Sequence, residues 1–149
     1  MRMNAYREYT NEFVTDKTRS LPERLFERYC ENNDKVEWVY KNGDTGQQYL
    51  SIVYMDGISK QWLVYPDYIV HLKDGTDWII ETKGGESSGH SKNIDMQIEN
   101  KFIAFKQYAK KYNLHWGFVR DIDEELFINN TEYVEDMSDD SWKPLEEEL

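Results

Sequence analysis

The chain has 149 residues, of which 32% are charged and 15% are aromatic, and its formal net charge is −11. This length and balance are typical of one folded domain and exclude a disordered polymer. The single cysteine, Cys30, excludes an internal disulfide framework and a multi-cysteine zinc site, and it favours a reducing compartment. No apolar run reaches the length of a membrane span and no signal-peptide pattern opens the chain, so we expect a cytoplasmic protein without a membrane partner.

The negative charge is concentrated towards the C-terminus. Residues 132–149 contain eight acidic side chains against one lysine, Lys143, so the rest of the chain is only mildly acidic. Acidic proteins repel nucleic acid at long range, which argues against strong autonomous DNA binding. The same charge remains compatible with a site that handles phosphate through metal ions.

The first predicted elements are a leader and a helix. Residues 1–19 show no clear period and are expected to form a leader or a short helix. From Ser20, the sequence SLPERLFERYCENN fits an amphipathic helix in which Ser20 and Glu23 form a capping box and Pro22 is tolerated in the first turn. Its apolar positions at helical spacing are Leu21, Leu25, Phe26, Tyr29 and Cys30.

Short runs rich in apolar residues follow and predict strands joined as hairpins or a meander. They are VEWVY (36–40), YLSIVY (49–54), QWLVYPDYIVHL (61–72) and DWIIETK (77–83). The turns between them are predicted at KNGDTG, where Asn42–Gly43 tolerates positive φ, at MDGISK and at KDGT.

The second half predicts a flexible loop, GGESSGHSKN (84–93), then a helix over about 93–112, a buried strand LHWGFVRD and a short strand within EELFINN. The acidic end of the chain offers Trp142 and Leu145 as docking points. This order of elements predicts an α/β domain built around one mixed sheet flanked by helices.

Charged residues stand at the ends of two predicted strands. Side-chain alternation places Glu81 and Lys83 on one face of their strand, with Ile80 and Thr82 on the other. Pairing of residues 62–72 with 78–83 through the KDGT turn would bring Asp67 close to Glu81. Two such carboxylates raise each other's pKa unless a cation lies between them, and Mg²⁺ accepts one or two carboxylates while keeping several waters. With Lys83 stabilising developing charge or orienting a water, this set suits phosphodiester hydrolysis.

These residues also resemble a known signature. Pro66–Asp67, thirteen intervening residues and then Glu81-x-Lys83 resemble the PD-(D/E)xK nuclease motif, whose two halves lie on adjacent strands. The wider pattern is similar to the C-terminal endonuclease domain of type III restriction enzymes, in the subunit that also carries the helicase motor. That pattern consists of Ser20, Glu23 and Phe26, then VEWVYKNGD, YPDYIV, WIIETKGG, Lys101 and the final SWKPLEEEL.

The resemblance implies a restriction-endonuclease-like fold and a DNA endonuclease. It implies a single nuclease domain with a leader (1–19), a core (20–131) and an acidic tail (132–149). Mg²⁺ or Mn²⁺ would be bound by Asp67, Glu81 and Glu23, Lys83 would be the catalytic lysine, and Lys101 would contact the DNA phosphate. The helicase moiety and a methyltransferase/specificity subunit would be partners. Because the chain has no Walker A loop and no DEAD-like box, we expect either an excised nuclease domain or a stand-alone relative.

Each site residue also has a simpler interpretation. Asp67 fits a solvated strand-entry turn, and Glu81 with Lys83 fits a surface ion pair. Glu23 is explained by the capping box, with Glu27 as a substitute acid one turn later. The basic residues that fit a solvated helix face are Lys101, Lys106, Lys110 and Lys111.

Further alternatives concern the loop and the whole chain. The three histidines, His71, His90 and His115, show no ligand spacing, and His90 and Ser88 lie in the predicted loop, which can close over DNA. Three other function classes stay open: a stand-alone repair or mobile-element nuclease with the same site, a non-catalytic DNA- or protein-binding module of this fold, and a small acidic interaction module whose tail is the functional part.

Overall fold

The computed structural model describes residues 3–4, 20–42, 50–55, 61–84 and 92–149. Most of the predicted leader, the predicted turn from Gly43 onwards and the part of the predicted loop with Ser88 and His90 lie outside these ranges. The strands are β1 (Met3–Asn4), β2 (Val36–Lys41), β3 (Ile52–Met55), β4 (Gln61–Val64), β5 (Tyr68–Leu72), β6 (Asp77–Lys83), β7 (His115–Ile122), β8 (Glu125–Asn129) and β9 (Lys143–Pro144). The helices are α2 (Leu21–Asn32), α3 (Lys92–Tyr112) and α4 (Leu145–Glu148).

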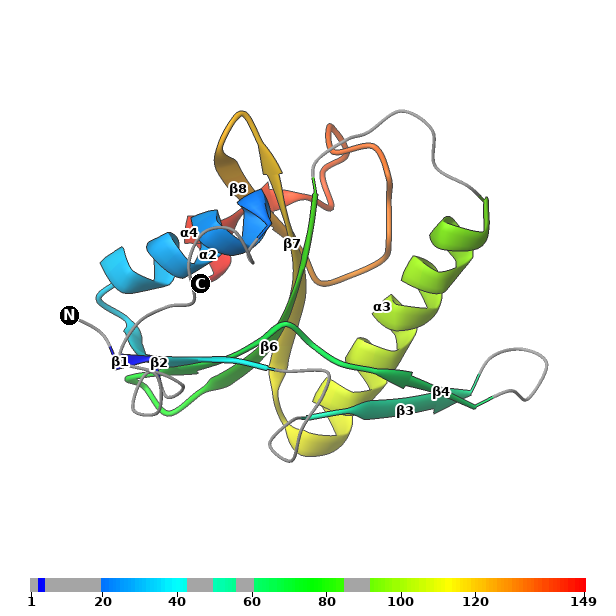
Figure 1. Ribbon diagram of the computed structural model, residues 1–149, viewed down its shortest axis with the longest axis horizontal. Helices are drawn as coiled ribbons and strands as arrows, with labels where there is room; N and C mark the ends of the chain where they lie inside the picture. The colour runs from blue at the N-terminus through cyan, green and yellow to red at the C-terminus, as the bar shows by residue number, and fades with distance from the viewer. Residues whose placement is uncertain (1–2, 5–19, 43–49, 56–60, 85–91) are drawn as a thin grey trace.

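The described strands form a seven-stranded sheet in the order β1-β2-β5-β6-β7-β8-β9 and a separate antiparallel ribbon, β3–β4. In the sheet, β1 pairs with β2 and β6 with β7 in parallel, and the other pairs are antiparallel. Helices α2 and α4 cover one face, and α3 covers the other (Figure 1). The predicted α/β architecture with a mixed sheet flanked by helices is confirmed.

The predicted run QWLVYPDYIVHL is two strands rather than one. β4 pairs with β3, whereas β5 pairs with β2 and β6, and the chain changes partner at Tyr65–Asp67. Proline has no backbone N–H to donate to a sheet, so Pro66 is a natural break. The buried Asn42 fixes the break, since its side-chain amide donates to the Pro66 carbonyl at 2.9 Å and its backbone N–H donates to the Asp67 carbonyl at 2.8 Å.

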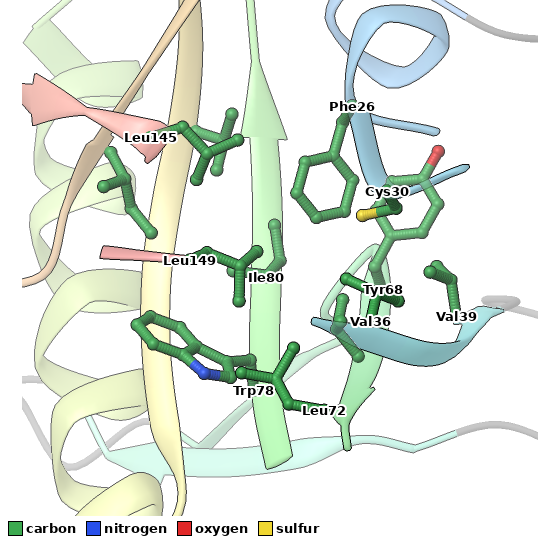
Figure 2. Packing of buried hydrophobic residues seen from close by; sticks show 13 residues of the cluster. Phe26, Cys30, Val36, Val39, Tyr68, Leu72, Trp78, Ile80, Leu145 and Leu149 are labelled. Carbon is green, nitrogen blue, oxygen red and sulfur yellow. The ribbon is translucent and has the colours of Figure 1, made fainter. Parts of the chain in front are cut away.

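Helix α2 begins as its sequence predicts. The Ser20 hydroxyl accepts from the Glu23 backbone N–H, and the Glu23 carboxylate accepts from the Ser20 backbone N–H at 2.8 Å, which completes the capping box. The buried face differs in part from the predicted stripe: Phe26 and Cys30 are buried, but Leu21 is 40% exposed. Figure 2 shows Phe26 and Cys30 packed beside Tyr68 of β5 in the core under α2.

The KDGT turn joins β5 to β6 as predicted. Gly75 has φ of +91°, a backbone conformation that favours glycine, and the Asp74 carboxylate accepts from the Thr76 backbone N–H at 2.8 Å. The resulting register pairs Tyr68 with Ile80 and Ile69 with Ile79. This register determines which residues meet at the far end of the hairpin.

The second core lies between the sheet and α3. Phe102 of α3 packs against Phe118 of β7, with ring centroids 4.1 Å apart, and meets Trp116 edge-on at 5.4 Å. The predicted helix over about 93–112 is confirmed. Among the described residues, no helix has both the length and the apolar composition needed to cross a membrane.

The acidic C-terminal segment is packed against the rest of the domain. Its buried apolar side chains, each at most 5% exposed, are Met137, Trp142, Leu145 and Leu149. Leu145 and Leu149 join the core under α2, whereas Met137 and Trp142 join the core under α3. The acidic residues are therefore displayed on a segment whose apolar side chains complete both cores.

Candidate active site

The predicted site residues come from elements that end near one another. Asp67 directly precedes β5, while Glu81 and Lys83 lie at the end of the neighbouring strand β6. The last pair between these strands is Tyr68 with Ile80, so Asp67 and Glu81 occupy the next position along the hairpin. The structure thus brings together the two carboxylates that the sequence predicts to be close.

Asp67 is held by Thr82, a residue that strand alternation assigns to the opposite face. The Asp67 Oδ2 atom accepts from the Thr82 backbone N–H and from the Thr82 hydroxyl, each at 2.8 Å. The alternation of side chains along a strand does not apply to Asp67, because this residue lies in the bend after Pro66 and outside β5. The Asp67 carboxylate accepts a hydrogen bond from the Thr82 backbone N–H, beyond the last residue pair between β5 and β6.

Glu81 is partly buried, and one oxygen of its carboxylate lies out of contact with solvent. Its Oε2 atom is inaccessible to solvent and has no hydrogen-bond partner among the described residues. Burial raises the pKa of the Glu81 carboxyl well above its ordinary value, and the charge of Asp67 and a hydrogen bond with it raise this pKa further. The positive charges of Lys101 and Lys41 act in the opposite direction on the same pKa. A carboxylate that is buried beside a second carboxylate has its pKa raised in this way.

Glu23 approaches the same place from the N-terminus of α2. Lys41, at the end of β2, places its ammonium 2.9 Å from Glu23 Oε1 and 3.5 Å from Asp67 Oδ1. Although burial raises the pKa of Glu23, its bonds with Lys41 and Ser20 prevail and hold that pKa below its ordinary value. Glu23 therefore serves the capping box and the acidic cluster at once, and the two interpretations of this residue are compatible.

Lys83 is engaged by the C-terminal segment. Its ammonium donates to the Tyr133 hydroxyl at 3.1 Å and lies 3.6 Å from Glu135 Oε2. Glu135 also lies 3.5 Å from the guanidinium of Arg120, a fully buried residue that donates to the Gly84 carbonyl just beyond β6. The end of β6 is thus tied to residues 133–135, which sequence reasoning did not connect with the site.

The remaining candidates have distinct positions. Lys101 is partly buried on α3 and contributes a positive charge at Glu81. Glu27 accepts from the Tyr68 hydroxyl at 2.9 Å inside the core under α2, which gives this acid a structural partner. His71 lies between Asp77, at 2.6 Å from its Nδ1, and Glu37, at 3.4 Å from its Nε2.

Asp67 and Glu81 fit a hard divalent cation. Mg²⁺ is commonly bound through one or two carboxylates plus waters, and the Glu81 Oε2 atom, which accepts no hydrogen bond from any residue that the structure describes, is an oxygen of the required kind. Across the described ranges, no three His, Cys, Asp or Glu side chains converge in a way that would hold a metal. The fit therefore concerns a pair of acids, with Glu23 held at a separate position by Lys41.

Lys41 and Thr82 are two further residues to which sequence reasoning assigned no role. Both lie at strand ends beside a predicted site residue, within the stretches VEWVYKNGD and WIIETKGG. For Lys41, the signal in the sequence is its position at the end of β2. In the sheet Lys41 pairs with Tyr68, the residue after Asp67. No protein-family model matches this chain, and no match is found among curated proteins.

Proposed function

We propose that this chain is a metal-dependent nuclease that hydrolyses DNA phosphodiester bonds, with a restriction-endonuclease-like fold. The observation that carries the proposal is the Asp67–Glu81 pair, in which the Glu81 Oε2 atom is buried and has no hydrogen-bond partner within the described part of the chain. A glutamate whose pKa is raised by burial and by a facing aspartate is costly to maintain in a fold, and such groups are concentrated at functional sites. The arrangement on adjacent strands is the one that the PD-(D/E)xK resemblance implies.

In this proposal, Asp67 and Glu81 hold Mg²⁺ or Mn²⁺. The ion supplies a Lewis acid for the phosphate and lowers the pKa of a bound water. Thr82 holds the Asp67 Oδ2 atom with two hydrogen bonds, and Oδ1 lies 3.5 Å from the Lys41 ammonium. Lys83 carries the positive charge for the reacting phosphate, and Lys101 adds a second positive charge near Glu81.

The DNA would be delivered to this domain by a partner. The net charge of −11 opposes autonomous binding, because electrostatic attraction to phosphates supplies most non-specific affinity. A helicase moiety together with a methyltransferase/specificity subunit, as in type III restriction enzymes, would provide recognition and affinity. A stand-alone repair or mobile-element nuclease with the same site is the alternative within this class.

A non-catalytic binding module is favoured by one observation. The Lys83 ammonium contacts both the Tyr133 hydroxyl and the Glu135 carboxylate, so a structural role is enough to explain the proposed catalytic lysine. In that case the charges at the end of β6 would stabilise the C-terminal segment, and no cleavage would occur.

Plasmid nicking tests the proposal. Purified protein is incubated with supercoiled plasmid in Mg²⁺, Mn²⁺ or EDTA at low salt, beside Asp67→Asn, Lys83→Met and the surface control Glu125→Gln. We expect metal-dependent nicking by the wild-type protein and by Glu125→Gln, and none by the other two variants. Retained Mn²⁺ binding by Lys83→Met and lost binding by Asp67→Asn would separate their roles. Nicking that persists in Asp67→Asn would overturn the proposal.

A further inference from the structure

Lys41 occupies the space between two acids of the cluster. Its ammonium lies 2.9 Å from Glu23 Oε1, 3.5 Å from Asp67 Oδ1 and 4.8 Å from the centre of the Tyr68 ring. The side chains of Lys41 and Glu23 are each 16% exposed, and that of Asp67 is 22% exposed. The ammonium is therefore a largely buried cation with two carboxylates and an aromatic face around it.

The backbone fixes the position of this ammonium. Asn42, the next residue, donates its backbone N–H to the Asp67 carbonyl at 2.8 Å and its side-chain amide to the Pro66 carbonyl at 2.9 Å. On the other side, the capping box holds Glu23 by the Ser20 backbone N–H at 2.8 Å. The cation and its two acids are each anchored to a different element, so their meeting does not depend on a flexible side chain alone.

The Asp67 carboxylate is divided between two sets of partners. Thr82 occupies Oδ2 with two hydrogen bonds, whereas Oδ1 faces the Lys41 ammonium. Glu81, which neighbours Asp67, has a buried oxygen without a hydrogen-bond partner in the described ranges. If a divalent ion were bound by Asp67 and Glu81, the position between Asp67 and Glu23 would already be occupied by the Lys41 ammonium.

We propose that Lys41 is a positioning residue that acts as a built-in cation: it takes the place of a second divalent ion between Glu23 and Asp67 and limits the site to one. In two-metal sites the ions are about 3.5–4 Å apart and share a carboxylate, which is the relation that Lys41 would have to an ion on Asp67. The ammonium neutralises Glu23 without requiring metal ligands at that position. This inference rests on the proposed function, because it presumes one divalent ion at Asp67 and Glu81.

Mn²⁺ stoichiometry tests it without measuring catalysis. Free Mn²⁺ is followed by electron paramagnetic resonance during titration of the full chain, and circular dichroism checks that each variant is folded. We expect one ion bound by the wild-type protein, two by Lys41→Met and one by Lys41→Met combined with Glu23→Gln. Lys41→Arg, which keeps the charge, and Lys101→Met, which removes a charge from another side of the cluster, should each bind one. Lys41→Gln is measured in parallel in case Lys41→Met does not fold.

The outcomes separate this inference from the proposed function. A wild-type protein that binds no Mn²⁺ would remove the proposed metal site, and the inference with it. One ion in both the wild-type protein and the Lys41 variants would leave the metal site intact and overturn the role of Lys41. Two ions in the wild-type protein, or two in the variant that also lacks the Glu23 charge, would overturn it as well.

Discussion

Asp67 accepts two hydrogen bonds from Thr82 through the same carboxylate oxygen, one from the backbone N–H and one from the hydroxyl, each 2.8 Å long. This relationship joins the bend before β5 to the end of β6 and sets the orientation of the acid on which the candidate site depends. It also leaves the second Asp67 oxygen directed towards Lys41.

Thr82→Val should weaken this anchor while conserving side-chain shape. The substitution removes the hydroxyl donor and keeps the backbone N–H, and a hydrogen bond to a charged group contributes about 1.5–3 kcal/mol. Because Asp67 is partly exposed and keeps its bond from the Thr82 backbone N–H, we expect a loss of about 1 kcal/mol in the free energy of unfolding by urea, which is below that range. Thr82→Ser keeps a hydroxyl and serves as the control. Equal stability of the valine variant and the wild-type protein would contradict an anchoring role.

Glu81→Gln should stabilise the metal-free protein at neutral pH. The pKa of Glu81 is raised above its ordinary value of 4.5, so the folded state holds this proton more tightly than the unfolded state does. The contribution to stability is full below pH 4.5 and is lost as the pH rises through the raised pKa. In EDTA, we expect the melting temperature of the variant to exceed that of the wild-type protein at pH 7 by more than at pH 4.

Metal reverses the effect of the same substitution. A ligand that binds only the folded state at about 100 times its Kd adds about 2.7 kcal/mol to stability. Mn²⁺ should therefore raise the melting temperature of the wild-type protein and of the Glu125→Gln control, but not that of Glu81→Gln. An equal rise in all three proteins would place the ion elsewhere.

Glu23 variants should separate capping from the acidic cluster. Glutamine can still accept in a capping box, so Glu23→Gln loses only the charge beside Lys41, whereas Glu23→Ala also loses the cap, for about 1 kcal/mol more. The pKa of Glu23 is lowered, so its charge stabilises the fold above its ordinary pKa of 4.5 and this contribution is lost as the pH falls through the lowered pKa. The Glu23→Gln defect should accordingly shrink on acidification, as measured by thermal unfolding at several pH values.

The nicking activity of Glu23→Gln tests whether Glu23 belongs to the active site. If Glu23 belongs to the active site, Glu23→Gln should lower metal-dependent nicking strongly. Normal turnover combined with a lower melting temperature would leave Glu23 with its capping role and its pair with Lys41.

The C-terminal segment should be tested by charge neutralisation rather than by deletion. Leu145 is 1% exposed and Leu149 is fully buried, so removal of residues 136–149 should unfold the protein, and Leu145→Ala alone should cost about 2–5 kcal/mol. Glu146→Gln with Glu147→Gln changes two exposed acids and leaves the packing intact. If these acids repel DNA, fluorescence anisotropy at low salt should show tighter binding that disappears as salt is added. No gain in affinity would mean that this surface faces away from the DNA.

Local sequence patterns predicted the elements that depend on nearby residues. The α2 capping box joins residues three positions apart, the KDGT turn contains the glycine that its positive φ favours, and α3 follows a helical apolar period. The pairing of β5 with β6 follows from that turn, so the approach of Asp67 to Glu81 was also predictable. These features rest on short-range geometry, which sequence spacing encodes directly.

Tertiary structure alone decided the partners of the charged groups. Lys41 meets Glu23 because β2 and the start of α2 converge, and Lys83 meets Tyr133 because the C-terminal segment packs back onto the domain. Thr82 contacts Asp67 because Asp67 lies in the bend between β4 and β5, where the alternation of side chains along a strand does not apply. Such contacts depend on strand register and on the packing of elements that are far apart in the chain. A long charged side chain can contact any of several partners, so sequence spacing does not indicate which one it pairs with. The sequence by itself therefore determined which acids approach one another, and the packing of the domain determined which cations they meet.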